Sequence, residues 1–293
     1  MRSQKVFLIT GCSSGFGKAL VQGALDTGHK VVAASRCPDI LRFDGANKNN
    51  YIPVALDLGS SASVKAAFDK SARKFGRVDV VINNAGYGLA GAFEELTDDD
   101  VQSVMDVNFM GVVRVTRQAI QTMRDINNPP GGLIQQITSI GGQAGMAVVS
   151  AYCASKWAVE GLTESIAKEM RPEWNIKLMC IEPGGFRTEW AKKNMVFRDP
   201  RQAIPAYNHL DAEKIMAGAS RAQMGDPVKG AAAILQLAAV RNPPLRVPLG
   251  SEAFGIMEAK WKHGLETYRE FENIALPVDL DAGEEYGRVL SQL

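Results

Sequence analysis

The strongest constraint on the fold is a short apolar run near the start of the chain that leads directly into a glycine-rich turn. Lys5–Thr10 forms this run, K-V-F-L-I-T, which is typical of a buried parallel strand. Gly11, Gly15 and Gly17 follow, and a helical pattern then extends to Leu25. Such glycines let the backbone approach a pyrophosphate, whose charge a helix N-terminus stabilises. Tight turns also use glycine for structural reasons alone, but this position in an alternating chain predicts dinucleotide binding.

Apolar strands and helices alternate along most of the chain. With 293 residues, 46% of them hydrophobic, the chain can bury a full core as one large domain. Alternation of this kind predicts an α/β fold with a parallel sheet. Helices are expected at about 60–75, 98–126, 226–240 and 251–274. Further strands are expected at Lys30–Ala34, Tyr51–Leu56, Val78–Ile82, Leu133–Thr138, Asn175–Ile181 and Leu245–Leu249.

Charge and residue usage argue against several classes of function. The formal net charge is +1 and the charges are well mixed, so no broad field attracts nucleic acid or an anionic membrane. No apolar run approaches the roughly 18 residues of a membrane span, and the polar start of the chain does not resemble a signal peptide. The four cysteines show no paired spacing, and the three histidines no ligand pattern. We expect a reduced, cytoplasmic protein without a metal site.

The end of the second expected strand bears on cofactor choice. In a nucleotide-binding fold of this kind, an acid here binds the free 2′-hydroxyl of the adenosine ribose, whereas an arginine accommodates a 2′-phosphate. Ser35 and Arg36 occupy this position, and no acid is present. The alternative is that Arg36 extends along the strand end with its charge in solvent. The pair predicts a preference for NADP(H) over NAD(H).

A tyrosine and a lysine four residues apart are candidates for acid–base chemistry. Tyr152 and Lys156 would lie one turn apart on the same face of a helix. A neighbouring ammonium lowers the pKa of a phenol, which is otherwise about 10, and this makes Tyr152 a plausible general acid or base. The spacing alone also arises by chance. Ser139, at the end of the fifth strand, would bind the substrate oxygen beside Tyr152, although it could equally be a turn residue.

Two further polar segments are expected near the same site. Residues 83–86, Asn-Asn-Ala-Gly, follow the fourth strand, and Gly86 would allow a close approach to the cofactor. Asn108 falls in the middle of the helix expected at 98–126, where an amide is unfavourable without a cause. A catalytic role and a purely structural role both remain open for Asn108.

Beyond the sixth strand the regular alternation lapses. Residues 189–222 are amphipathic and rich in Trp, Met and Phe, which predicts a lid over a lipophilic substrate; the alternative is that these side chains are ordinary core. Residues 251–293 form a C-terminal extension that ends in an acidic tail. The side chains expected to contact the substrate are Met146, Val148, Trp190 and Met195, together with Phe186 and Tyr87.

Taken together, these motifs resemble the short-chain dehydrogenase/reductase family. The resemblance rests on Thr10-Gly11-x-x-x-Gly15-x-Gly17, residues 83–86, Asn108, Ser139, Tyr152-x-x-x-Lys156 and Pro183-Gly184, in the family's order and spacing. It covers roughly residues 4–250. The sequence of residues 10–15, Thr-Gly-Cys-Ser-Ser-Gly, also resembles the corresponding stretch of the hydroxysteroid and retinol dehydrogenase branch.

The resemblance implies a single Rossmann domain, a doubly wound seven-stranded parallel sheet with helices on both faces. It implies a catalytic tetrad of Asn108, Ser139, Tyr152 and Lys156, with Asn108 holding a water that links Lys156 to solvent. It also implies a nicotinamide cofactor, contacted by Asp57 at the adenine and by Thr188 at the carboxamide. The expected cofactor-binding residues are Gly11, Ser13, Ser14, Gly15, Phe16, Gly17, Ser35, Arg36, Asp57, Leu58, Asn84, Ala85, Gly86, Tyr152, Lys156, Pro183, Gly184, Phe186 and Thr188.

The function expected from these features is hydride transfer between nicotinamide and a lipophilic ketone or secondary alcohol, with Tyr152 exchanging the proton. The rival enzyme class is the extended branch of the same superfamily, the sugar-nucleotide epimerases and dehydratases. Those enzymes place two residues between the first two glycines, whereas this chain has three, so the spacing argues against this class. A non-catalytic dinucleotide-binding redox sensor would typically lack the Tyr-x-x-x-Lys pair. A reductase-derived cyclase stays open as an alternative. By analogy with relatives that pack through their long helices, a homo-oligomer is also expected.

Overall fold

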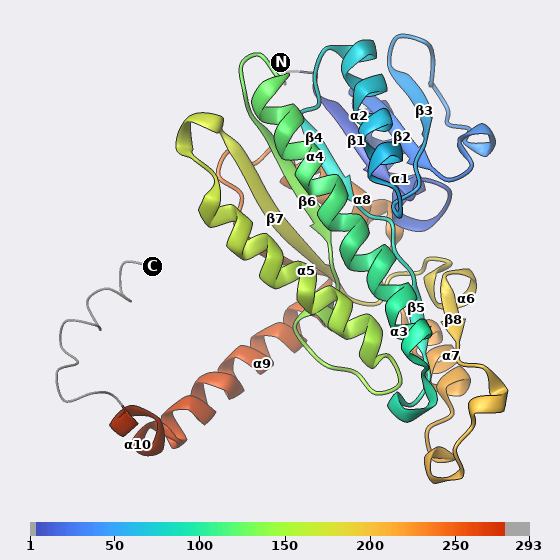
Figure 1. The fold of residues 1–293 in the computed structure, drawn as a ribbon, viewed down its shortest axis with the longest axis vertical. Helices are drawn as coiled ribbons and strands as arrows, with labels where there is room; N and C mark the ends of the chain where they lie inside the picture. Colours follow the sequence, from blue (N-terminus) through green and yellow to red (C-terminus); the bar gives the residue numbers. More distant parts are fainter. Residues whose placement is uncertain (1–3, 279–293) are drawn as a thin grey trace.

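Seven parallel strands form the centre of the molecule, and their order is β3-β2-β1-β4-β6-β7-β9 (Figure 1). The computed structural model describes residues 4–278. The order reverses between β1 and β4, and at such a switch point the carboxyl ends of the strands open into a crevice. The predicted doubly wound sheet is confirmed. Its strands are β1 Val6–Thr10, β2 Lys30–Ser35, β3 Tyr51–Ala55, β4 Val80–Asn83, β6 Gly132–Ile137, β7 Ile176–Pro183 and β9 Arg246–Leu249.

Helices cover both faces of the sheet because side chains alternate along each buried strand. In β1, Phe7 and Ile9 pack in the hydrophobic cluster beneath α1 (Gly15–Asp26) and α8 (Pro227–Leu237). Val6 and Leu8 pack in the opposite cluster. This second face lies beneath three helices, of which α4 and α5 cross the front of the sheet in Figure 1. They are α2 Ser61–Phe75, α4 Gly111–Asp125 and α5 Ser150–Glu169.

The helix predicted at 98–126 is not continuous. It is divided into α3 (Asp98–Met105), a π-helical turn (Asp106–Met110) and α4. Asn108 lies in the π-helical turn, where the widened backbone accommodates an amide that a regular helix disfavours. The sequence therefore indicated correctly that Asn108 is unfavourable in a regular helix, but the prediction of one continuous helix over 98–126 was wrong.

A small second sheet lies within the segment predicted as a lid. The strand β8 (Met195–Phe197) pairs in parallel with β5 (Gly88–Ala90), which follows the end of β4 closely in sequence. Two helices complete the segment, α6 (Trp190–Lys193) and α7 (Ala212–Ala222). Three-residue strands have too short a pattern to be recognised in a sequence, and this pairing was missed.

A buried carboxylate holds the loop that follows β8. Glu95 forms an ion pair with Arg198 and accepts a hydrogen bond from the backbone amide of Ile204, at 3.0 Å. Burial opposes ionisation, but these partners and the Ala92 amide hold the pKa of Glu95 below its usual range. Residues 198–204 are thereby attached to the body of the protein.

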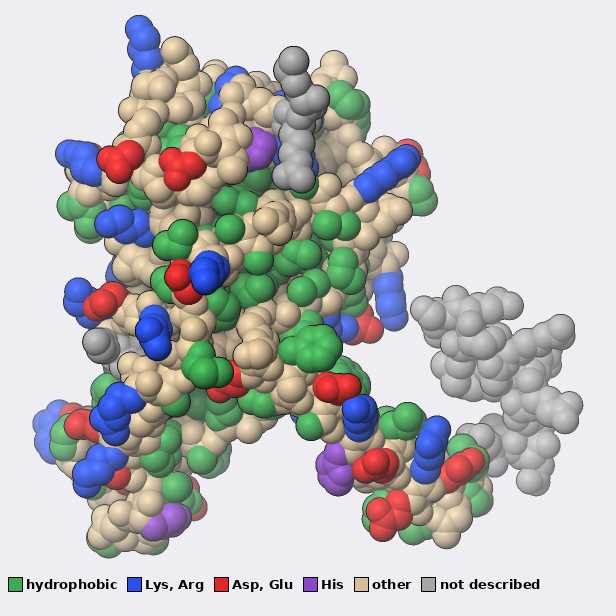
Figure 2. Space-filling view, turned by 180° about the vertical axis from the view of Figure 1, so that it is seen from behind, with side chains coloured by type: hydrophobic (Ala, Val, Ile, Leu, Met, Phe, Trp, Pro, Cys, Tyr) green, Lys and Arg blue, Asp and Glu red, His purple; other side chains and the backbone are tan. Residues whose placement is uncertain are grey.

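The C-terminal extension projects from the body as a helix, α9 (Ser251–Glu270), followed by α10 (Glu272–Ala275). Figure 2 shows it as an arm that leaves the rest of the molecule. Within α9, only Ala253 and Met257 are buried. The acidic tail lies mostly outside the described residues. In the part of the chain that is described, no helix is both long and apolar enough to cross a bilayer.

A group of buried carboxylates lies between α5 and the end of β7. Glu160 and Glu182 are 2% and 3% exposed. The guanidinium of Arg246 on β9 donates to Glu160 at 2.9 Å and to Glu164 at 2.7 Å. Burial, followed by the charge of Glu160, raises the pKa of Glu182 to about 7, although Arg246 opposes the shift. Glu182 therefore keeps its proton at pH values where an exposed carboxyl has lost it.

This shift predicts how stability depends on pH. Between pH 4.5, the usual pKa, and about 7, native Glu182 holds a proton that the unfolded chain has released. The free energy of unfolding should therefore fall as pH rises through this window, by up to about 1.4 kcal/mol per pH unit. Glu182→Gln cannot ionise, so urea denaturation should show it gaining stability over the unaltered protein between pH 5 and 8. Glu164→Gln is the control, because Arg246 lowers the pKa of Glu164. A constant Glu182→Gln difference across this range would contradict the assignment.

Candidate active site

The glycine-rich turn joins β1 to α1 in a conformation that requires glycine. Gly11 and Gly15 have φ values of +70° and +52°. A Cβ on Gly17 would overlap the carbonyl oxygen of Gly11. The N-cap residue Ser14 makes no side-chain hydrogen bond, so the first-turn amides of α1 have no side-chain acceptor and can bind an anion. The turn therefore fits the pyrophosphate of a dinucleotide.

Two residues fix this turn against the end of β4. The hydroxyl of Thr10 accepts hydrogen bonds from the backbone amides of Asn84 and Ala85, both at 3.0 Å. In return, the side-chain amide of Asn84 donates to the carbonyl oxygens of Thr10 and Gly11, at 2.9 and 3.2 Å. Asn84 thus has a structural task in addition to its place at the cavity.

One cavity of about 580 Å³ follows the carboxyl ends of the strands on both sides of the switch point. Most side chains proposed from the sequence line it, while Gly17, Asn108, Val148 and Met195 do not. The lining residues among those proposed are Gly11, Ser13, Ser14, Gly15, Phe16, Ser35, Arg36, Asp57, Leu58, Asn84, Ala85, Gly86, Tyr87, Ser139, Met146, Tyr152, Lys156, Pro183, Gly184, Phe186, Thr188 and Trp190.

The β2 end of the cavity carries one arginine, Arg36, and one aspartate, Asp57. The hydroxyl of Ser35 accepts a hydrogen bond from the amide of Cys37 at 3.2 Å, which orders the turn. Arg36 is exposed, and its guanidinium has no ion-pair partner among residues 4–278. Asp57 accepts from the amide of Gly59 at 2.9 Å. Arg36 is therefore available to a ligand.

At the other end, α5 and the end of β6 bring together Ser139, Tyr152 and Lys156. Tyr152 and Lys156 are 5% and 6% exposed. The ammonium of Lys156 donates to the carbonyl of Ile137 at 2.9 Å and lies 5.8 Å from the centre of the Tyr152 ring. Ser139 hydrogen-bonds the Tyr152 hydroxyl and accepts from the Gly141 amide at 3.0 Å. A hydroxyl, a phenol and an ammonium therefore converge at one end of the cavity.

Burial controls the ionisation of both α5 residues. It raises the pKa of Tyr152 to about 12, and the hydrogen bond with Ser139 offsets only part of this effect. The net lowering of the Tyr152 pKa that was expected beside Lys156 is not found, because desolvation of the phenolate is the larger effect. Burial also lowers the pKa of Lys156 to about 8, opposed by the charge of Glu160. The phenol of Tyr152 therefore keeps its proton at physiological pH.

Asn108 does not face the cavity. It is fully buried, and its amide group donates to the carbonyl of Tyr87 at 2.8 Å and to the Ser155 hydroxyl at 3.1 Å. Its side-chain oxygen accepts from the Tyr87 amide at 3.0 Å. Both amide hydrogens are thus used within the protein. Asn108 positions the segment of Gly86 and Tyr87, which lines the cavity.

The apolar end of the cavity is formed partly by expected and partly by unexpected residues. Met146 and Trp190 line it, and the centres of the Trp190 and Tyr152 rings are 5.0 Å apart. Val148 and Met195 instead pack beneath these side chains in a buried cluster, a correction to the predicted substrate contacts. Val148 has a φ of 61°, which is rare for a β-branched residue.

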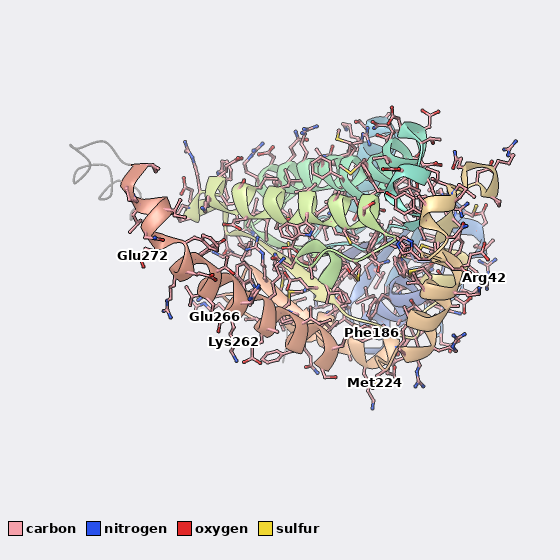
Figure 3. The ribbon with its side chains drawn as sticks, turned by 90° about the horizontal axis from the view of Figure 1, so that it is seen from below. Arg42, Phe186, Met224, Lys262, Glu266 and Glu272 are labelled. Carbon is pink, nitrogen blue, oxygen red and sulfur yellow. The ribbon has the colours of Figure 1, made fainter. Side chains whose placement is uncertain are left out.

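Sequence reasoning placed α7 within the predicted lid segment, 189–222, but did not identify the residues of α7 and its flanking segments that line the cavity. One face of α7 lines the cavity with Ile215, Ala219 and Ala222, which lie about one turn apart from each other along the helix. This spacing of apolar residues on an amphipathic helix is the sequence signal that could have identified the lining face. Phe186 packs against Phe16 with ring centres 4.8 Å apart. Figure 3 shows Phe186 and Met224 in this region, with Lys262, Glu266 and Glu272 leading away along the projecting arm. The missed lining residues include Ile140, Val149, Asn194, Ile215, Met216, Ala219, Ala222, Gln223 and Glu252.

Comparisons with known proteins agree with this geometry. Residues 5–198 match the sequence profile described as short chain dehydrogenase. An uncharacterized oxidoreductase of Schizosaccharomyces pombe is 39% identical over 85% of this chain and 83% of its own. A 3-ketodihydrosphingosine reductase of Bacteroides thetaiotaomicron is 36% identical over 84% of this chain and 88% of its own. A short-chain dehydrogenase from Streptomyces avermitilis, known from its crystal structure, has a TM-score of 0.83 and 32% identity, covering 94% of this chain and all of the other.

The lowered pKa of Lys156 predicts a pH dependence of dinucleotide binding. Below about pH 8 the side chain is a cation, and above that value it becomes neutral. If Lys156 holds the cofactor, affinity for a reduced dinucleotide, measured by its fluorescence, should weaken as pH rises through about 8. Lys156→Met should bind weakly without this step. Lys260→Met, which changes a lysine over the exposed Trp157 ring, is the control. An unchanged step in Lys156→Met would assign the titration to another group.

Proposed function

Because the chain belongs to the short-chain dehydrogenase/reductase family, an oxidoreductase family that binds a nicotinamide dinucleotide, we propose that it is an NADP(H)-dependent carbonyl reductase. Its substrate is a lipophilic ketone, or the secondary alcohol in the reverse direction. The observation that carries this proposal is a single cavity with Arg36 at one end and Ser139, Tyr152 and Lys156 beside apolar walls at the other.

The residues along the cavity fit an extended dinucleotide. The glycine-rich turn would hold the pyrophosphate, Asp57 and Leu58 would flank the adenine, and Lys156 would hold the nicotinamide ribose. When bound, the nicotinamide supplies or accepts the hydride, which is chemistry that no side chain provides. The remaining tasks of orientation and proton transfer fall to the protein.

Tyr152 is the proton donor for reduction. With a pKa of about 12, its phenol carries a proton at neutral pH and can give it to a carbonyl oxygen as negative charge develops there. Ser139, which already hydrogen-bonds Tyr152, orients the same oxygen. Lys156, as a cation, stabilises the phenolate that remains. The raised pKa keeps Tyr152 in the protonated form that reduction requires.

Several features support a lipophilic carbonyl substrate. Met146, Trp190 and the α7 face surround the proposed reaction site with apolar side chains, and burial there would strengthen binding of an apolar skeleton. The name of the bacterial relative, a 3-ketodihydrosphingosine reductase, points to a ketone as well.

We assign residues 189–222 the role of a lid, in which the backbone moves mainly beyond residue 204. We further place the enzyme in the cytoplasm as a homo-oligomer, on the sequence arguments above.

Removal of one oxygen atom tests the role of Tyr152. Tyr152→Phe keeps the ring but removes the proton donor, so turnover of a lipophilic ketone with NADPH should fall by at least about a hundredfold. The dissociation constant for NADPH should hardly change, which fluorescence titration can verify. Tyr268→Phe on the projecting helix is the matched control, because its side chain is exposed and remote from the cavity. Retention of most of the activity in Tyr152→Phe would refute the proposed mechanism. A lack of turnover in the unaltered protein would favour the redox sensor.

Cofactor choice is tested at the end of β2. A guanidinium binds a phosphate through charge-assisted hydrogen bonds, so Arg36 should favour NADPH over NADH by about ten- to a hundredfold. Arg36→Ala should lower kcat/KM for NADPH much more than for NADH. Addition of Ser35→Asp should move the preference further toward NADH, because a carboxylate repels the 2′-phosphate. Arg73→Ala, an exposed arginine on α2, is the control. Equal use of both cofactors by the unaltered protein would show that Arg36 does not bind the phosphate.

A further inference from the structure

We propose that Glu252 forms a subsite for a hydrogen-bond donor on the substrate, so that this enzyme selects lipophilic carbonyl compounds that also carry a hydroxyl or an ammonium group. The inference rests on the proposed reductase function and narrows its substrate class. It assigns a task in the active site to the C-terminal extension, on which Glu252 lies.

Glu252 is an exposed residue, and one hydrogen bond places its carboxylate against the wall of the cavity. Its Oε2 atom accepts a hydrogen bond of 2.7 Å from the backbone amide of Gly185. A Cβ on Gly184 or Gly185 would lie 3.1 or 2.9 Å from the same oxygen, so the carboxylate packs directly on these glycines. A Cβ on Gly185 would also lie 3.2 Å from the Cγ atom of Gln223. Gly185 therefore fixes the carboxylate beside an amide at the wall of the cavity.

The same turn of α9 forms part of the substrate end. Ala253, the next residue, is fully buried and packs in one cluster with Ile140 and Met146. Ile140 directly follows Ser139, and both Ile140 and Met146 line the cavity. Glu252 directly precedes Ala253, and its carboxylate lies against Gly184 and Gly185, at the margin between this wall and the residues expected at the cofactor.

Glu252 is chemically distinct from its surroundings. The other charged residues on the cavity wall are Arg36, Asp57 and Lys156, each at a position proposed to bind the cofactor. The α7 residues that line the substrate end are apolar. In the described part of the chain, no cation pairs with Glu252, and its Oε1 atom accepts no hydrogen bond.

These properties define what the subsite can bind. A carboxylate only accepts hydrogen bonds, so its partner must donate one, and a cationic donor gains most. An anionic group at the same place would be repelled. The apolar walls still select for a lipophilic skeleton. The combination fits a hydroxylated or amino-substituted ketone and disfavours a ketone that bears a carboxylate.

Matched ketones can test the subsite directly. The probes are 4-phenyl-2-butanone and its ortho, meta and para derivatives that carry a hydroxyl, an aminomethyl or a carboxylate group. In the unaltered protein, at least one hydroxyl or aminomethyl isomer should exceed the parent ketone in kcat/KM by about ten- to a hundredfold. The carboxylates should be worse than the parent.

Two variants separate charge from position. Glu252→Gln keeps an oxygen that can accept from Gly185 but lacks the charge, so the ratio of kcat/KM for the aminomethyl probe to that for the parent ketone should fall to about one. Glu252→Ala should also remove the hydroxyl preference. Glu258→Gln, on the same helix and outside the cavity, is the control. NADPH titration of each variant verifies that the site is folded.

The outcomes distinguish this inference from the function on which it rests. Reduction of the parent ketone without any preference for donor groups, or a preference that survives in Glu252→Gln, overturns the subsite and leaves the reductase intact. If no probe is reduced, thermal shifts of the NADP⁺-saturated protein with the corresponding alcohols still measure binding without turnover. Equal shifts for the parent and all donor-bearing alcohols would then overturn the subsite too.

Discussion

The active site depends on the hydrogen bonds that join the end of β1 to the end of β4. Thr10 accepts from two consecutive amides, and Asn84 returns two bonds to the carbonyls of Thr10 and Gly11. These bonds lie at the switch point, directly beyond Ile9 and Ile82, the last paired residues of β1 and β4. They fix the glycine-rich turn relative to Gly86 and so set the distance between the two halves of the dinucleotide site. In a buried setting, each such bond also removes the cost of an unpaired backbone group.

Burial is the second organising influence. Tyr152 and Lys156 are almost fully covered, and removal of water shifts both pKa values toward the neutral forms. A phenol that keeps its proton and an amine that titrates near neutrality follow from the same cause. Glu182, which interacts with Glu160 one turn along α5 from Lys156, responds similarly. Around α5, burial shifts these pKa values more than attraction between charged side chains does. The four-residue spacing of Tyr152 and Lys156 therefore did not predict the direction of the Tyr152 pKa shift.

The sequence was sufficient for the sheet because strand ends carry strong local signals. Short apolar runs that end at small or polar residues located all seven strands to within two residues at each end. It also identified Ser139, Tyr152 and Lys156 as a group. Asn108 was found as an anomaly, but the π-helical turn that explains it depends on Tyr87 and Ser155, which are distant in sequence. The β5–β8 pairing, the buried positions of Val148 and Met195, and the place of Glu252 arise from tertiary packing, which periodicity does not encode.

The parallel register of β5 and β8 restricts how the substrate site can diversify. Gly88 pairs with Met195 and Ala90 with Phe197, and Gly88 has no room for a side chain beneath Met195 and Trp190. An insertion of one residue between Trp190 and Met195 would exchange the inward and outward faces of β8. Glu95 fixes the following loop at Arg198 and Ile204. Changes of length should therefore be tolerated between 205 and 211, where homologues can vary the apolar end of the cavity while Ser139, Tyr152 and Lys156 keep their positions.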